Sequence, residues 1–146
     1  MQAPNLCCLS VVALIGLSAP ANAAGVQVLT GPGLHYEIGR LGVPSATVGA
    51  PDTKGALYTF FVRYDRGLRS PPHTHPDDRV ITVLSGTLYV GSGFDKASLD
   101  RAEGMPAGTV FLIKGGLPHY GWAKDGPVTV QETGVGPTST TLFSPQ

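Results

Sequence analysis

The chain has 146 residues, enough for one domain, and its 10 basic and 10 acidic residues give it no net charge at pH 7. A neutral chain lacks the basic surface that nucleic acids and anionic membranes attract, so neither is expected as a main partner. Its 20 glycines and 13 prolines are spread along the sequence, which is typical of many short strands joined by turns.

The first 23 residues differ in composition from the rest of the chain. They contain no charged side chain, and Leu6–Leu17 is an apolar run of about a dozen residues, too short to span a bilayer. Ala21–Ala23 then has the A-x-A form of a signal-peptidase site. We therefore predict that residues 1–23 are a cleaved secretory signal and that 24–146 form one secreted, periplasmic domain without membrane association. A disordered or anchoring tail is the alternative. Both cysteines lie in the predicted signal, which excludes a disulfide or thiolate ligand from the mature chain.

The remaining chain consists of short segments rich in β-branched and aromatic residues, separated by Gly, Pro and Asp. We expect strands at Val26–Leu29, Leu34–Ile38, Leu57–Tyr64, Val80–Val90, Thr109–Lys114, His119–Ala123, Val128–Thr133 and Thr140–Phe143. Within the fourth segment, Ser85-Gly86 marks a bend or a hairpin turn. Helical character is confined to residues 94–103, for at most a turn or two. Many short strands at this spacing predict an all-β sandwich or barrel.

Three of the four histidines fall in two short segments punctuated by glycine. His73 and His75 are two residues apart, so on a β-strand their imidazoles project from the same face. His119, from another strand, would complete a facial site of three histidines. His35 stands apart and is interpreted as a structural or surface residue. The cluster predicts a mononuclear metal centre inside a small β-barrel.

These segments resemble the first of the two sequence motifs of the cupin family. That motif, G-x5-H-x-H-x(3,4)-E-x6-G, corresponds to Gly67, His73, His75 and Gly86, with Arg79 where the family has glutamate. The resemblance implies that both histidines are metal ligands. It also implies that the carboxylate which usually completes the site is missing from its position.

The second cupin motif, G-x5-P-x-G-x2-H-x3-N, is also present in part. It corresponds to Gly108, Gly116 and His119, with Lys114 in place of proline and Ala123 in place of asparagine. The resemblance implies an RmlC-like jelly-roll barrel of two antiparallel sheets, with the site in its interior. By analogy with the family, it also implies a possible homodimer.

The arginine in the first motif determines the possible chemistry. Arg79 shares the strand parity of the two histidines and is expected to point inward with them, but its protonated guanidinium cannot ligate a metal. At about 5 Å from a dication, in an effective dielectric of about 20, its charge costs on the order of 6–7 kcal/mol. Three hypotheses follow. The histidines hold Fe, Mn, Ni, Cu or Zn while Arg79 binds an anionic substrate; the metal is lost and Arg79 anchors an anion; or Asp77 or Asp78 replaces the missing carboxylate.

These residues predict a metal-binding cupin that acts on a small, anionic molecule. Gln131, on a late strand, is a second candidate for substrate binding, while Glu132 has the opposite parity. If the chain is an enzyme, oxygenase chemistry is favoured over isomerase or decarboxylase chemistry, because a histidine-rich site without thiols suits redox-active iron or copper. A metal-free binding or sensor protein with Arg79 as the anion anchor is the alternative. A structural or storage role is a third hypothesis.

Overall fold

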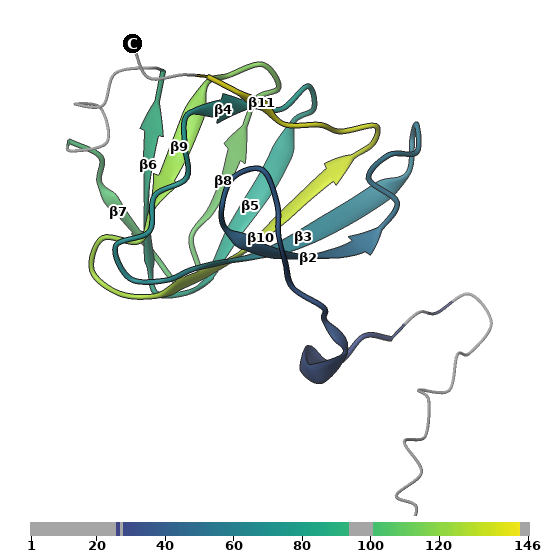
Figure 1. Ribbon diagram of the computed structural model, residues 1–146, viewed down its shortest axis with the longest axis horizontal. Coiled ribbons are helices and arrows are strands. Elements are labelled where there is room, and N and C mark those ends of the chain that lie inside the picture. The colour runs from purple at the N-terminus through teal and green to yellow at the C-terminus, as the bar shows by residue number, and fades with distance from the viewer. Residues whose placement is uncertain (1–25, 27, 94–100, 144–146) are drawn as a thin grey trace, which may run out of the picture. The chain divides into compact units, whose positions relative to one another are not determined.

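The strands of the protein form two antiparallel sheets. The structure, a computed structural model, describes residues 26, 28–93 and 101–143, and the predicted signal lies outside these residues. One sheet has the order β1 (Glu37–Ile38), β2 (Pro44–Gly49), β3 (Leu57–Tyr64), β10 (Val128–Val135), β5 (Arg79–Ser85) and β8 (Val110–Ile113). The other has the order β11 (Thr141–Leu142), β4 (His73–Thr74), β9 (His119–Trp122), β6 (Thr87–Ser92) and β7 (Gly104–Pro106) (Figure 1).

This architecture confirms the prediction of an all-β jelly roll. The only helix in the described part of the chain is the single 3₁₀ turn η1 (Gly31–Gly33). No helical segment there has the length and apolarity needed to cross a membrane. Of the segment predicted as helical, 94–100 lies outside the described residues and 101–103 is not helical.

One predicted strand is absent from the described residues, and two strands of the structure were not predicted. Val26–Leu29 is not a strand in the residues described there, which are exposed and have no pairing partner. Two strands, β2 and β7, were missed because Pro, Ser, Ala, Gly and Met give them little β-propensity. Both strands exist because a neighbouring strand supplies the hydrogen bonds: β3 pairs with β2, and β6 pairs with β7.

The bend predicted at Ser85-Gly86 is confirmed, and it carries the chain from one sheet to the other. Gly86 has a φ of 76°, in the left-handed region that favours glycine. A Cβ built there would lie 2.2 Å from the carbonyl oxygen of Pro127, so a larger residue would clash with the backbone. Gly86 therefore ends β5 and starts β6, and the two strands do not pair as a hairpin.

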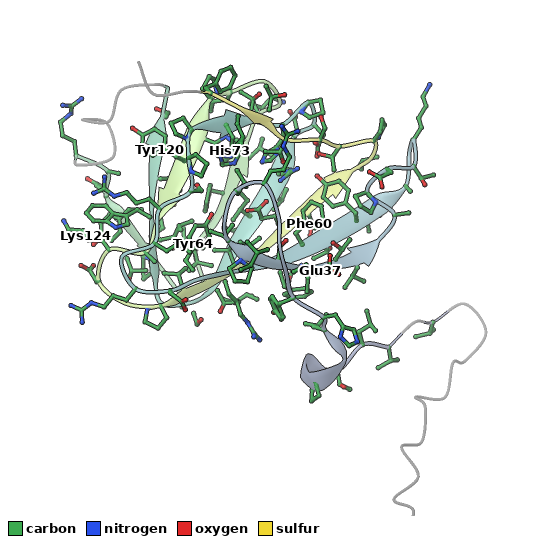
Figure 2. All side chains as sticks on the ribbon, in the orientation of Figure 1. Glu37, Phe60, Tyr64, His73, Tyr120 and Lys124 are labelled. Atoms are coloured by element: carbon green, nitrogen blue, oxygen red, sulfur yellow. The ribbon has the colours of Figure 1, made fainter. Side chains whose placement is uncertain are left out.

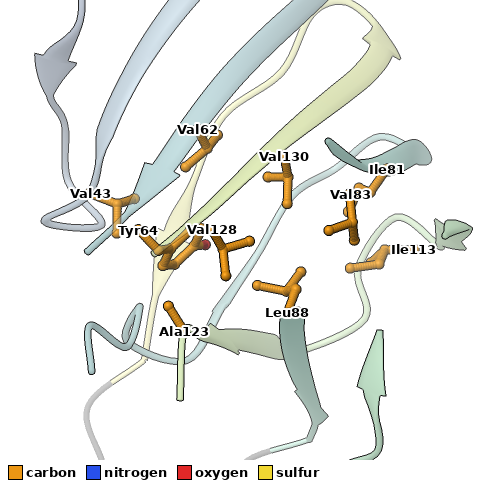
Figure 3. Packing of buried hydrophobic residues seen from close by; sticks show 10 residues of the cluster. All are labelled: Val43, Val62, Tyr64, Ile81, Val83, Leu88, Ile113, Ala123, Val128 and Val130. Carbon is orange, nitrogen blue, oxygen red and sulfur yellow. The ribbon is translucent and has the colours of Figure 1, made fainter. Parts of the chain in front are cut away.

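Buried apolar side chains from both sheets form the core, as Figure 3 shows. On β10, Val128 and Val130 are almost fully buried, while Thr129 and Gln131 between them are only half-buried. β10 lies between β3 and β5 in the sheet, and this alternation turns every second side chain of β10 toward the interior.

The outer face of the six-stranded sheet is partly apolar. Val80 on β5 and Val110 and Leu112 on β8 are exposed there. A second copy of the chain could cover such a face. The homodimer stays a prediction.

Candidate metal centre

The strands β4 and β9 bring the three predicted histidines together. His73 on β4 pairs directly with His119 at the start of β9, and His75 follows β4 by one residue. All three side chains are buried, and their ring centroids lie 4.3 to 5.4 Å apart. One nitrogen from each ring falls within a group whose members lie within 4.8 Å of one another. Figure 2 shows His73 beside β4.

Backbone carbonyls fix the orientation and tautomer of each ring. The Nδ1 atoms of His73, His75 and His119 lie 2.8, 2.8 and 2.9 Å from the carbonyl oxygens of Pro71, Ser139 and Leu117. A carbonyl oxygen only accepts, so each Nδ1 must carry the hydrogen and donate it. The Nε2 atom of each ring therefore has a free lone pair. This hydrogen bonding to the outer nitrogen is typical of histidines that bind a metal.

Burial keeps the three imidazoles neutral. It lowers the pKa of His73 to about 4, helped by the neighbouring His119. It lowers the pKa of His75 to about 3, helped by the charge of Arg79, and it also lowers the pKa of His119. At neutral pH the Nε2 atom of each of the three rings is therefore unprotonated, as a divalent metal requires of its ligands.

Arg79 points inward as predicted, but two carboxylates and a hydroxyl already surround it. Its Nη1 donates to Glu132 Oε2 at 2.9 Å, and its Nη2 donates to Thr138 Oγ1 at 2.8 Å. Its Nε lies 3.5 Å from Asp77 Oδ2. One positive charge thus faces two negative charges. The repulsion expected between Arg79 and a dication is opposed by this excess of negative charge.

The two neighbouring aspartates lie in different surroundings, and neither belongs to the histidine group. Asp77 accepts hydrogen bonds from Tyr58 and Thr138. Burial alone would raise the pKa of Asp77, but these bonds and the charge of Arg79 outweigh it and lower the pKa. Asp78 is exposed and binds Lys114 and the backbone N–H of Gly115.

A cavity of about 130 Å³ adjoins the histidine cluster. His75, Arg79 and Glu132 form its polar side, and Phe60, Val62 and Tyr64 lie on its apolar side. A second, smaller cavity of about 20 Å³ is lined by His73 and His119, and Glu132 borders it as well. The larger space is below the roughly 300–1,000 Å³ of pockets for drug-sized ligands, so any molecule bound beside His75 would be small.

Comparison with known proteins gives a partial match in sequence and a broader one in structure. No protein-family model matches the chain. Germin-like protein 8-2 from Oryza sativa subsp. japonica is 44% identical over 55 residues, which are 35% of this chain and 24% of the relative. Germin-like protein 8-11 from the same plant is 41% identical over 56 residues. The chain therefore spans about a quarter of the length of these curated relatives.

The solved structures match most of the chain at low sequence identity. The polyketide cyclase RemF from Streptomyces resistomycificus has a TM-score of 0.64 and 19% identity over 82% of this chain and 87% of its own. An RmlC-like cupin from Shewanella frigidimarina has a TM-score of 0.58 and 16% identity over 75% and 91% of the two chains. The chain has the cupin fold. A mutant salicylate 1,2-dioxygenase from Pseudoaminobacter salicylatoxidans, solved with gentisate, matches 68% of this chain and 29% of its own at a TM-score of 0.54 and 14% identity.

Measured against the cupin motifs, this chain keeps the histidines and carries a carboxylate on a different strand. Glu132 on β10 pairs with Ile81 on β5, two residues beyond Arg79. Glu132 is two residues after Val130 and four after Val128, so on a strand it shares the face of these two buried valines. This spacing is the feature of the sequence that indicates an inward-facing Glu132. In the 130 Å³ cavity Glu132 is a lining residue, and Gln131 is not among the described lining residues. The amide of Gln131 instead donates to Thr133 Oγ1 at 3.4 Å.

Proposed function

We propose that this cupin binds one divalent metal ion through the Nε2 atoms of His73, His75 and His119 and acts on a small molecule in the adjoining cavity. The observation that supports this most strongly is the bonding of the outer nitrogens. Each Nδ1 donates to a carbonyl, so three neutral Nε2 lone pairs are available in one buried group. Neutral imidazole suits iron, copper, nickel and zinc alike.

The proposed chemistry is that of a metal-dependent enzyme, with oxygenase chemistry favoured. A divalent metal in this position would polarise a substrate oxygen or support reactions of dioxygen. The chain's own residues would enclose the substrate: Phe60 and Val62 exclude water from one side, while Arg79 and Glu132 supply charge on the other. A dioxygenase and a cyclase share the fold, but a fold alone does not select a reaction.

The alternative, a metal-free cupin that anchors an anion on Arg79, has less support. The guanidinium already faces Glu132, Asp77 and Thr138. An anion would have to displace a carboxylate or sit against a group whose charges sum to minus one. A dication reverses that sum to plus one, so we expect an anionic substrate to bind only when the metal is present.

The experiment that tests the proposal is metal analysis by elemental mass spectrometry on the untagged full chain. We expect near-stoichiometric Fe, Mn, Ni, Cu or Zn in the wild type and almost none in His73→Ala/His75→Ala. His35→Ala is the matched control, because His35 is an exposed histidine outside both motifs. Its metal content should equal that of the wild type.

Two outcomes would contradict the metal proposal. One is a metal-free wild type that also takes up none of the five added metals. The other is an equal loss of metal in His35→Ala and in the double variant, which would point to nonspecific binding by surface histidines. Stabilisation of the metal-free protein by phosphate would favour the anion-binding alternative.

We also propose that the chain is exported and that residues 1–23 are removed. Support comes from the sequence alone: an uncharged apolar run ends at the A-x-A segment Ala21–Ala23. Amino-terminal sequencing of protein recovered from the periplasm should begin at Ala24. An intact Met1 on the periplasmic protein would contradict cleavage.

A further inference from the structure

Glu132 is an ionisable side chain on an otherwise apolar strand face. The residues before it on that face, Val128 and Val130, are each 1% exposed. Across the sheet it pairs with Phe60 on β3 and Ile81 on β5. A carboxylate is rarely placed in such surroundings without a partner or a function. Arg79 is the partner, and it engages one of the two carboxylate oxygens.

The second carboxylate oxygen is the one available to a ligand. Among the hydrogen bonds of the described residues, Oε2 accepts from Arg79 and Oε1 accepts none. Nor is Oε1 among the buried polar atoms that lack a partner. Glu132 lines the 130 Å³ cavity beside His75 and Arg79. Oε1 therefore has no hydrogen-bond partner among the described residues and is not fully buried, while Arg79 holds Oε2 in place.

The carboxylate stands near the metal ligands but outside the ligand group. The group of close donor atoms contains the three histidines and no carboxylate. The charge of Glu132 nevertheless acts on His119, whose pKa it raises against the lowering effect of burial. This arrangement places a base next to the site without making it a ligand. It suits proton transfer to or from a molecule held between the two.

We propose that Glu132 is the proton acceptor of this site and that its substrate is a small acid bound as the anion. The inference rests on the proposed metal-dependent function. An O–H bond, or a C–H bond beside a carbonyl, breaks in the bound molecule. Its proton forms a new O–H bond with Oε1, and the electron pair stays on the molecule. Arg79 is the positioning residue, because its Nη1 fixes Oε2.

The charges of the site agree with this substrate class. Arg79, Asp77 and Glu132 sum to minus one, and a bound dication makes the sum plus one. A molecule that enters as a neutral acid and gives its proton to Glu132 leaves the total unchanged. Its conjugate base then faces the metal, and the charge of the carboxylate is removed at the same moment. No proton needs to pass from the buried site to solvent.

The test counts protons released to the buffer when a simple acid binds. Acetohydroxamic acid, which chelates divalent metals as its anion, is titrated into the Zn²⁺-loaded full chain. Calorimetry is run in two buffers with different ionisation enthalpies. Between wild type and Glu132→Gln we expect a difference of about one proton per bound molecule, with the variant releasing the greater number. Glu37→Gln, an exposed glutamate on β1, is the matched control and should match the wild type. In Arg79→Met the count should move toward that of Glu132→Gln.

The possible results distinguish failure of the role of Glu132 from failure of the metal proposal, the substrate class or the role of Arg79. Zinc uptake with equal proton release in wild type and Glu132→Gln overturns the role of Glu132 and leaves the metal proposal standing. Failure of the wild type to take up zinc or any of the other four metals overturns both. Zinc uptake without hydroxamate binding overturns the assigned substrate class. A count in Arg79→Met equal to the wild type overturns the positioning role of Arg79.

A measurement on the wild type alone covers the case in which Glu132→Gln does not fold. Infrared difference spectra are recorded with and without acetohydroxamic acid on protein labelled with ¹³C-glutamate. We expect the carbonyl band of a protonated carboxylic acid to appear on binding and to shift with the label. A spectrum without that band overturns the proposal.

Discussion

The interior of this barrel has two ends that the same strands build differently. Arg79 is the first residue of β5 and Glu132 lies in the second half of β10, and the two side chains form an ion pair. Further along the pair, Val83 faces Val130, and both are almost fully buried. The two strands pair from Thr133 and Val80 to Thr129 and Ser85, with a register shift between Thr129 and Val130. Along this stretch the inward-facing side chains change from an ion pair to close-packed methyl groups.

The difference indicates that the two ends serve different purposes. Apolar contacts contribute stability in proportion to the surface they bury. A buried ion pair contributes little net stability, because the cost of taking the charges out of water offsets their attraction. An end of a small barrel that contains three neutral histidines and three charged side chains is therefore poorly explained by folding. The polar end is better explained by function.

Removing the charge at the centre of the polar end should have the largest effect on stability. Arg79→Met leaves Asp77 and Glu132 facing each other without a cation. Breaking a buried ion pair from one side typically costs about 3–5 kcal/mol. Urea unfolding of the metal-free protein should show a loss in this range. The control Arg63→Met removes an exposed arginine stacked on Tyr36 and should change the free energy of unfolding much less.

A second substitution should restore stability to Arg79→Met if its loss of stability comes from an unpaired buried charge. Arg79→Met/Glu132→Met removes the cation and the carboxylate that its Nη1 binds. Replacing both members of a buried pair with apolar residues is often neutral or stabilising. The double variant should therefore recover more than half of the stability lost in Arg79→Met. A double variant as unstable as the single one would show that Arg79 is needed for packing instead.

The apolar end should respond to a cavity. Val83→Ala truncates a side chain that is 0% exposed and packs in the core cluster. We expect a loss of about 2–3 kcal/mol in the free energy of unfolding. The metal content of the folded fraction should not change, since Val83 is not part of the histidine group. A fall in both stability and metal content would mean that the two ends are coupled.

The sequence was sufficient to predict that the three histidines come together, but not which charged side chains lie around them. Spacing and parity predicted that His73 and His75 point inward, and a strand from elsewhere in the chain did supply His119. The partners of Arg79 come from segments 53 and 59 residues away, and only the pairing of β5 with β10 brings them together. Local pattern carries no information on that register. The expectation that Arg79 faces a metal or an anionic substrate therefore did not include Glu132 as its partner.

Metal bound at the polar end should raise the free energy of unfolding of the protein, and the size of this gain should not depend on the packing of the apolar end. A ligand that binds only the folded state adds about 2.7 kcal/mol when its free concentration is a hundred times Kd. Thermal unfolding of the wild type with Zn²⁺ should show a higher midpoint than without it. Val83→Ala should show an equal rise, whereas His73→Ala/His75→Ala should show none. A rise of the same size in the histidine variant would place the zinc elsewhere.

The smallest effect on stability is expected from a substitution at Asp78, which follows the inward-facing Asp77 in sequence. Asp77 is bonded to Tyr58 and Thr138 and lies near Arg79, so Asp77→Asn removes charge from a buried network and should cost about 1–2 kcal/mol. Asp78 is exposed and pairs with Lys114 on the surface, where solvent and salt screen the interaction. Asp78→Asn should therefore leave the midpoint of thermal unfolding unchanged within error. If the two variants lose equal stability, the boundary between the polar interior and the surface does not fall between these two residues.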